Sequence, residues 1–400
     1  MLNRRELLRH IGLGTVASSL PGISFAKADT DARLVLVILR GAADGLAIAA
    51  PYGEGKYQSL RGELALPEPG ASNGLLKLDG LFGLHPSLAN THDFYEKHEA
   101  LVVHAVSSPY RERSHFDGQD VLENGVGTAG GKRDGWLNRA LAPLGGSLGN
   151  EAAIAMSQNT PLVLRGSNSV TSWAPSQLPD ADDDTIQRIA MLYAEDEFFS
   201  TRLSQALDSQ RIAGDIGDME KTRRRGNDAA QTNSMMQSAG KFLTAPDGPQ
   251  IAVVESGGWD THANQGSMSG GLANKLAGLD QGLGALRKQL GPAWSDTVVA
   301  VVTEFGRTVR VNGTRGTDHG TATAALLLGG AVNGGRIVTD WPGLATNNLY
   351  GGRDLYPTTD VRSIFKGILW EHLRIKPDYL DRAVFPGSIS APITQDLIRN

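Results

Sequence analysis

Five short, nearly continuous apolar segments constrain the fold of this chain most strongly. They are rich in β-branched residues, end in turn-forming residues, and span 33–41, 100–108, 250–258, 296–304 and 322–330. Such segments are typical of strands that are buried on both faces of a parallel sheet. Parallel strands need crossover connections, usually helices. The segments therefore predict an α/β fold with a mainly parallel central sheet.

Helical patterns lie between and after these segments. Leucines recur at spacings of four and three after the third segment, at Leu272, Leu276, Leu279, Leu283, Leu286 and Leu290. This pattern predicts one apolar helix stripe that Gly291 and Pro292 close. A second helix is expected after Asp360. Helices that alternate with buried strands predict a three-layer sandwich.

Residues 29–400 are interpreted as a single domain with one helical insertion. The insertion, at about 180–248, is charged, interrupts the strand rhythm and carries helical apolar spacing from Ile186 to Leu207. We expect it to lie over one end of the sheet. The glycine- and serine-rich segment 125–149 is expected to be a surface loop.

The first 28 residues have the pattern of a cleavable export signal. Arg4 and Arg5 precede a short, weakly apolar core, and Ala26 and Ala28 form an A-x-A cleavage site. Paired arginines indicate the Tat translocase, a partner during export, and predict a periplasmic or secreted protein. Because this route carries folded proteins, it suits a chain that binds a metal cofactor before crossing.

The amino-acid composition excludes some metal ligands and some classes of partner. The chain has no cysteine, which excludes disulfides and thiolate ligands, so any metal must be bound by oxygen and imidazole nitrogen. A net charge of −5 argues against nucleic acid as a partner. No segment after the signal approaches the ~20 apolar residues of a membrane-spanning helix. We therefore expect a soluble mature protein without a membrane span.

Acidic and imidazole side chains gather where the predicted strands end or begin. They are Asp44 after the first segment, Asp260 and His262 after the third, Glu304 and Arg307 after the fourth, and Asp318 and His319 just before the fifth. Ligands of open α/β sheets bind outside the carboxyl ends of the strands. Each residue alone is compatible with a structural role, but their combination predicts a metal site.

The pair Asp260 and His262, and also Glu304, each have more than one interpretation. Asp260 and His262 are two residues apart, so in extended backbone they face the same side and could share one ion, or they could be structural. The carboxylate of Glu304 ends an apolar strand, and burying it costs several kcal/mol unless Arg307 or a metal compensates it.

Ser114 is a candidate nucleophile that precedes a predicted helix. With Asp117 three residues later it has the pattern of an N-cap with a capping box. The free N–H groups and dipole of a helix N-terminus also favour an anion or an alkoxide. His115 is either a hydrogen-bond partner of the site or a ligand.

The motifs "RGAADGL", "LHPSL", "RSHFDGQD", "GGWDTHANQ", "TEFGRT" and "GTDHGTATAALLLGG" together resemble the bacterial family called domain of unknown function 1501. The resemblance covers essentially the whole mature chain. That family is in turn similar to the alkaline phosphatase and sulfatase superfamily, whose members share a metal-bearing α/β sandwich. The resemblance implies an alkaline-phosphatase-like fold here.

The resemblance also implies roles for individual residues. Asp44 would bind one ion beside the nucleophile Ser114, and Asp260, His262 and His319 would bind another. Glu304 would take the place of the acid in the superfamily's adjacent acid-histidine pair.

This sequence departs from that pattern, because Phe305 follows Glu304 where a histidine is expected. A second alignment makes Asp318 and His319 the pair, but it leaves only His372, inside a predicted helix, as the later histidine. We prefer the first alignment, in which Asp318 either orients His319 or supplies a ligand to the ion near Asp44.

The resemblance implies an exported metal-dependent hydrolase of phosphate or sulfate esters. Its substrate would be a small anionic ester, and Arg307 would steady the anion. One or two divalent ions are expected, with Zn or Mn favoured, and with Mg or Ca fitting an oxygen-richer site. The alternative is a non-catalytic metal- or partner-binding protein on the same fold, which the incomplete ligand set favours.

Overall fold

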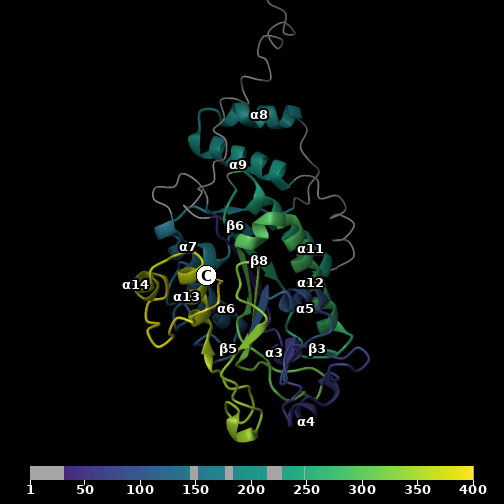
Figure 1. Ribbon diagram of the computed structural model, residues 1–400. Coiled ribbons are helices and arrows are strands. Elements are labelled where there is room, and N and C mark those ends of the chain that lie inside the picture. The colour runs from purple at the N-terminus through teal and green to yellow at the C-terminus, as the bar shows by residue number, and fades with distance from the viewer. Residues whose placement is uncertain (1–30, 145–151, 176–182, 214–227, 247, 400) are drawn as a thin grey trace, which may run out of the picture.

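The computed structural model describes residues 31–144, 152–175, 183–213, 228–246 and 248–399. The signal peptide expected at residues 1–28 lies outside these ranges. Within them, helices cover both faces of a nine-stranded sheet (Figure 1). The expected α/β sandwich with a mainly parallel central sheet is confirmed.

The central sheet has the strand order β11-β5-β10-β9-β1-β8-β6-β7, and β12 also pairs with β5. The strands are β1 (Arg33–Leu39), β5 (Ala100–Ser107), β6 (Ala153–Met156), β7 (Thr171–Ser172), β8 (Ile251–Ser256), β9 (Thr297–Thr303), β10 (Thr323–Leu328), β11 (Arg336–Val338) and β12 (Thr359–Asp360). The five predicted segments form β1, β5, β8, β9 and β10.

β10 is the exception to the parallel arrangement that its apolar sequence suggests. It runs antiparallel to both neighbours, β5 and β9, whereas β1 pairs in parallel with β8 and β9. An antiparallel strand begins at the edge where its neighbours end. The residues just before β10 therefore lie at the same edge as those just after β5, β8 and β9.

Alternating side chains of the strands fill two apolar cores. In β1, Leu34 and Leu36 face one core and Val35 and Val37 face the other. The first core packs against α6 (His115–Asn124), α7 (Trp136–Leu141) and α13 (Val361–Glu371). The second packs against α5 (Ala89–Glu96), α11 (Asp228–Thr244) and α12 (Gly271–Leu290). Figure 1 shows these two helix groups on opposite sides of the sheet.

Both predicted helices form. The six leucines of the predicted stripe are buried along α12, which ends at Gly291 with a φ of 53°. Asp360 is the N-cap of α13, and its side chain accepts a hydrogen bond from the Arg362 amide. This cap satisfies one of the free N–H groups of the helix.

The charged segment at 180–248 contains α8 (Asp183–Tyr193), α9 (Glu197–Ala213) and α11 within its described parts. α11 packs against α12, with Met236 and Phe242 fully buried, so it belongs to the layer that covers the sheet. α8 and α9 lie beyond one end of the sheet, at the top of Figure 1.

The segment expected to be a loop at 125–149 contains a helix instead. Trp136, Leu137 and Ala140 of α7 are buried in the first core. The surrounding glycines hid this short apolar pattern. Further short elements include α3 (Gly45–Ile48), α4 (Tyr57–Arg61), α14 (Pro377–Tyr379) and a small sheet of β2 (Ala49–Ala50), β4 (Gly83–Leu84) and β3 (Leu76–Lys77). Within the described ranges, no helix combines the length and apolar character needed to cross a membrane.

Candidate metal centre

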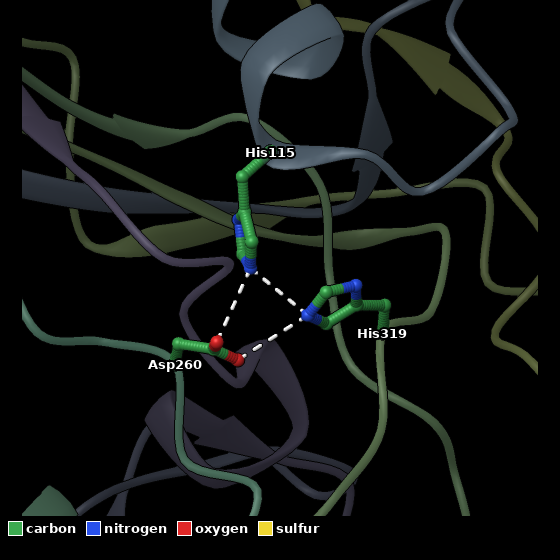
Figure 2. Close-up of side chains that lie close together, drawn as sticks. All are labelled: His115, Asp260 and His319. Carbon is green, nitrogen blue, oxygen red and sulfur yellow. Dashed lines mark hydrogen bonds and ion pairs between the residues drawn. The ribbon is translucent and has the colours of Figure 1, made fainter.

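Three side chains from distant parts of the chain meet at the edge where β5, β8 and β9 end. His115 is the first residue of α6, Asp260 follows β8 and His319 precedes β10. The antiparallel direction of β10 brings His319 to this edge. One ligand atom of each residue lies within 4.8 Å of the others, a spacing that could hold a metal ion. Figure 2 shows the three side chains pointing toward one another.

The distances within this group fit a common ion. The Nε2 atoms of His115 and His319 are 2.9 Å apart, and His115 Nε2 lies 3.4 Å from Asp260 Oδ2. His319 Nε2 lies 3.3 Å from Asp260 Oδ1. Two ligands at zinc distances of about 2.0–2.1 Å would be roughly 3.3 Å apart at a tetrahedral angle. The two histidine–carboxylate separations match this spacing, and the 2.9 Å between the imidazole nitrogens is shorter by about 0.4 Å.

The hydrogen bonds of the two imidazoles determine where their protons lie. His115 Nδ1 is 2.8 Å from Glu304 Oε1, and His319 Nδ1 is 2.8 Å from the carbonyl oxygen of Arg113. Both oxygens accept, so each Nδ1 carries the proton and donates it. In the neutral rings both Nε2 atoms then present lone pairs to each other. This arrangement needs a cation between the rings, either a metal ion or a proton.

His262 extends the group. Its Nε2 lies 2.9 Å from His319 Nε2 and 3.1 Å from Asp260 Oδ1. Its Nδ1 lies 3.3 Å from Asp318 Oδ1, which also accepts a hydrogen bond from Asn312. The carboxylate of Asp318 thus orients His262, whereas the sequence suggested that it orients His319 or binds a second ion. Such outer carboxylates are typical partners of metal-bound histidines.

Glu304 lies behind His115 in the buried interior. Burial by itself raises the pKa of Glu304, but hydrogen bonds from His115, Gln119 and the Gly41 amide outweigh it and hold this pKa below its ordinary value. The carboxylate is therefore ionised, and its hydrogen bond raises the pKa of His115. Its Oε1 atom is occupied by three donors, so Glu304 orients His115 and does not face the group directly.

Arg307 holds Asp260 from the opposite side. Burial tends to raise the pKa of Asp260, but Arg307 Nη1, 2.6 Å from Asp260 Oδ1, outweighs burial and keeps this pKa low. The guanidinium also donates to the hydroxyl and the carbonyl of Thr317. The side chain of Arg307 is 0% exposed, so it contacts protein and has no surface for a substrate.

The structure does not bring Asp44 into the group. Asp44 is 1% exposed and forms an ion pair with Arg61, which is itself fully buried. Its Oδ2 atom also accepts a hydrogen bond from Gln265. The guanidinium of Arg61 supplies the positive charge that an ion beside Asp44 would have supplied. A hydrogen-bonded path through Gln265 and Thr317 connects Asp44 to Arg307.

Ser114 is the N-cap of α6, directly before His115. Its backbone is extended, and its side chain makes no capping hydrogen bond. The expected capping box is therefore wrong, since Asp117 instead accepts a hydrogen bond from the Tyr110 hydroxyl. The Ser114 hydroxyl is half-buried and not committed to the helix end.

Two glycines permit the close backbone approach that the site requires. A Cβ atom on Gly41 would lie 2.6 Å from the amide nitrogen of Asp260, and Gly41 has a φ of 119°. A Cβ atom on Gly316 would lie 2.3 Å from the carbonyl oxygen of His262. Both contacts are too short for any other residue, so these glycines fix the turns that carry the ligands.

The fold and the site define a three-layer α/β protein with a histidine- and carboxylate-lined centre at one sheet edge. Residues 31–379 match the family model described as "Protein of unknown function (DUF1501)", and the chain belongs to this family. No curated protein matches its sequence significantly.

Distant structural similarity links the chain to solved structures. The C-terminal periplasmic domain of EcEptC from Escherichia coli, in complex with Zn, is 12% identical, with a TM-score of 0.37 over 78% of this chain and 77% of that chain. Phosphonate monoester hydrolase of Agrobacterium radiobacter is 12% identical, with a TM-score of 0.38 over 86% and 74%. The PsFucS1 sulfatase from Pseudoalteromonas sp. is 11% identical, with a TM-score of 0.34 over 84% and 68%.

The sequence did not decide the role of His115. It left this residue open between ligand and hydrogen-bond partner, because a histidine at a helix start has many structural uses. His115 and Gln119 are four residues apart and therefore share one helix face, and this pattern could have indicated that His115 faces the site. Both side chains reach Glu304, which marks that face as the one toward β9.

Proposed function

We propose that this chain is an exported metal-dependent hydrolase of phosphate or sulfate esters. Its metal centre would consist of His115, Asp260 and His319, with His262 adjacent. One observation carries this proposal: the Nε2 atoms of His115 and His319 face each other at 2.9 Å while both Nδ1 atoms donate to oxygen acceptors. The export step depends on the signal pattern in residues 1–28.

The ligand set supports a zinc or manganese ion. Imidazole nitrogens and one carboxylate suit these metals better than calcium or magnesium, which prefer oxygen. A bound divalent ion would polarise the ester and lower the pKa of a bound water. The motif resemblance to the alkaline phosphatase and sulfatase superfamily favours ester hydrolysis as the use of this chemistry.

A nucleophile is needed beside the metal centre. We propose Ser114 as the nucleophile, because its hydroxyl lies at a helix N-terminus and is not used for capping. A bond would form between Ser114 Oγ and the phosphorus or sulfur while the bond to the ester oxygen breaks, and the serine proton would pass through water to that oxygen, so that the alcohol leaves. A water molecule would then attack the phosphorus or sulfur and the bond to Ser114 Oγ would break. One proton of that water would return to Ser114, and phosphate or sulfate would be released.

Arg307 would act on the substrate only through Asp260. Its guanidinium is buried against Asp260 and Thr317, so we propose it as a positioning residue and not as the group that steadies the anion. Glu304 would position His115, and Asp318 would position His262 in the same way.

A second function is favoured by the Asp44–Arg61 pair. Because Arg61 neutralises Asp44, the group supports one ion and not the two that clamp both oxygens in two-metal hydrolases. A single ion is also compatible with a non-catalytic protein that binds a metal or a partner on the same fold. Activity measurements separate the two functions.

The test combines metal analysis with ester hydrolysis. Protein equilibrated with Zn²⁺ or Mn²⁺ and desalted would be analysed for bound metal and assayed with p-nitrophenyl phosphate and p-nitrophenyl sulfate. Ser114→Ala and Asp260→Asn would be compared with wild type, and Ser59→Ala, on the exposed side of α4, would serve as the matched control.

The hydrolase proposal expects bound metal and a rate that falls by about 100-fold or more in Ser114→Ala, with metal retained. It expects loss of both metal and activity in Asp260→Asn. Bound metal with no activity in wild type would support the non-catalytic function. Activity that survives in Ser114→Ala would remove this serine as the nucleophile.

A further inference from the structure

A cavity of about 450 Å³ opens between the end of β5 and the start of α13. Its lining includes Arg111, Asp360 and the hydroxyl-bearing residues Thr358, Thr359, Ser363, Ser390 and Thr394. None of the residues that form the candidate metal centre lines this cavity. Its volume lies in the usual range of small-molecule pockets, about 300–1,000 Å³.

Arg111 is the positive charge in this cavity. Its Nη1 atom donates to Ser107 Oγ at 3.0 Å, to the Tyr110 carbonyl at 2.8 Å and to the Ser108 carbonyl. No carboxylate in the described part of the chain lies within ion-pair distance of this guanidinium. Burial lowers the pKa of Arg111, but an arginine stays charged under all ordinary conditions.

The hydrogen bonds of Arg111 leave part of its donor capacity unused. All of them leave from Nη1, so within the described residues Nε and Nη2 have no protein acceptor. A half-buried guanidinium normally pairs with a carboxylate or phosphate through two parallel hydrogen bonds. The three contacts from Nη1 hold the side chain in place and leave the other edge of its fork for a ligand.

Asp360 is the acid that lines the cavity, and Arg362 compensates it. Arg362 Nη2 lies 2.7 Å from Asp360 Oδ2, and Arg362 Nε lies 3.0 Å from Asp360 Oδ1. Asp360 Oδ1 also caps α13. Both oxygens of Asp360 are therefore committed to Arg362 and the helix end. Asp360 does not pair with Arg111, and its charge only partly offsets the lowering of the Arg111 pKa by burial.

Hydroxyl-bearing residues from two other segments surround Arg111 in the cavity. Thr358, Thr359 and Ser363 lie at and just before the start of α13, and Ser390 and Thr394 lie near the C-terminal end of the chain. The Oγ1 atom of Thr358 is buried behind this lining and does not open onto the cavity. Arg111 is therefore the group that can recognise an anion here.

We propose that this cavity binds a small polar molecule through one oxyanion group, a phosphate, sulfate or carboxylate. Arg111 Nε and Nη2 pair with two oxygens of the anion. The hydroxyls of Ser363, Ser390 and Thr394 face the polar remainder of the ligand. This inference does not depend on the proposed hydrolase activity, because no residue of the metal centre takes part.

The test measures oxyanion binding calorimetrically on the full-length protein as purified, with and without EDTA. Sulfate, inorganic phosphate and acetate serve as probes, and chloride at equal ionic strength is the control. The variants are Arg111→Met, Arg111→Lys and the control Arg133→Met, since Arg133 is exposed. Arg111→Lys keeps the positive charge but loses the two parallel donors of the guanidinium, and circular dichroism checks that both cavity variants fold.

The proposal expects at least one oxyanion to bind wild type and Arg133→Met equally, with EDTA making no difference. Affinity falls by about tenfold or more in Arg111→Met and by roughly threefold to tenfold in Arg111→Lys, with both variants folded. Equal affinity in wild type and both cavity variants would overturn it. So would binding that EDTA abolishes, since the anion would then bind at the metal centre, or the absence of binding by all three probes.

Discussion

Arg113 and Asp354 form an ion pair next to His319, with Asp354 buried and about a third of the Arg113 side chain exposed. Arg113 Nη2 and Nε lie 2.7 and 2.9 Å from Asp354 Oδ2, and Asp354 is 0% exposed. The backbone of Arg113 has a left-handed φ of 60°, and its carbonyl accepts the hydrogen bond from His319 Nδ1. The ion pair therefore stabilises an uncommon backbone conformation that orients a candidate ligand.

Asp354→Asn tests this relationship. The substitution removes the charge that holds Arg113, so its carbonyl turns away from His319 and the imidazole loses its fixed proton position. We expect metal affinity to fall by about 10–100-fold, as for other partners of ligating histidines. We expect the free energy of unfolding to fall by about 1–2 kcal/mol, because the charged hydrogen bonds of Asp354 to Arg113 and Thr321 weaken while Arg113 keeps solvent contact. Calorimetric metal titration and urea unfolding measure both.

Asp93→Asn is the control for this substitution. Asp93 pairs with Lys97 on the surface of α5, with about half of its side chain exposed. Metal affinity and stability should stay near wild type, because exposed ion pairs contribute about 0–1 kcal/mol. Wild-type metal affinity in Asp354→Asn would show that the ion pair does not orient His319.

Glu304→Gln should change the pH dependence of metal binding. The hydrogen bond to Glu304 raises the pKa of His115, so in wild type a proton competes with the metal for Nε2 as the pH falls below this raised pKa. The neutral glutamine removes that effect and moves the loss of metal binding to lower pH. Metal titrations between about pH 8 and pH 5 measure the shift. If Glu304→Gln lost its metal at the wild-type pH or at a higher pH, Glu304 would not control the protonation of His115.

His104 should contribute to loss of stability in mild acid. Burial lowers the pKa of His104 to about 4, while its ring bonds to the Ala49 carbonyl and the Ala105 amide. Because the folded pKa lies below the unfolded value of 6.5, the unfolded chain binds the proton first. The contribution of His104 is complete above about pH 6.5 and is lost as the pH falls toward 4, amounting to about 3 kcal/mol.

His104→Gln removes this titration. Burial also lowers the pKa values of His85 and His372, so the variant should retain part of the slope of unfolding free energy against pH. Urea unfolding at about pH 7.5 and pH 5 should show a smaller difference for the variant than for wild type. An equal difference in the two proteins would show that His104 is not held neutral in the fold.

Arg61→Met should destabilise the protein without removing its metal. The substitution leaves the Asp44 carboxylate buried and unpaired, which costs about 3–5 kcal/mol. Asp44→Asn combined with Arg61→Met should recover part of that loss. Metal content should remain that of wild type, because Asp44 is not a ligand of the group. A lower metal content in Arg61→Met with intact folding would return Asp44 to the metal centre.

The strands, the main helices and most side chains of the metal centre could be predicted from the sequence. Apolar segments that end in turns indicate strands of either direction. The segment 322–330 therefore predicts β10 although this strand is antiparallel to its neighbours. Asp260, His262 and His319 were found because they flank those segments. Asp260 Oδ1 lies 3.1 Å from His262 Nε2, which agrees with the expectation that residues two apart face the same side.

The roles of Asp44, Glu304 and Arg307 depend on partners that the sequence does not pair. Arg61 lies 17 residues from Asp44, and the carbonyl that binds His319 belongs to a residue 206 positions away. Whether a buried carboxylate meets a guanidinium, an imidazole or a metal depends on tertiary packing alone. Sequence patterns indicate that Glu304 needs a partner, either Arg307 or a metal, whereas the structure pairs it with His115.

The most direct test of the metal centre is the metal content of wild type and His319→Ala after equilibration with Zn²⁺ and Mn²⁺ and removal of free metal. His319→Ala leaves Arg307 and Asp260 paired, so folding can be checked independently by circular dichroism. We expect about one bound divalent ion per wild-type chain and a large loss of bound metal in folded His319→Ala. Equal metal content in the two proteins, or none in wild type, would contradict it.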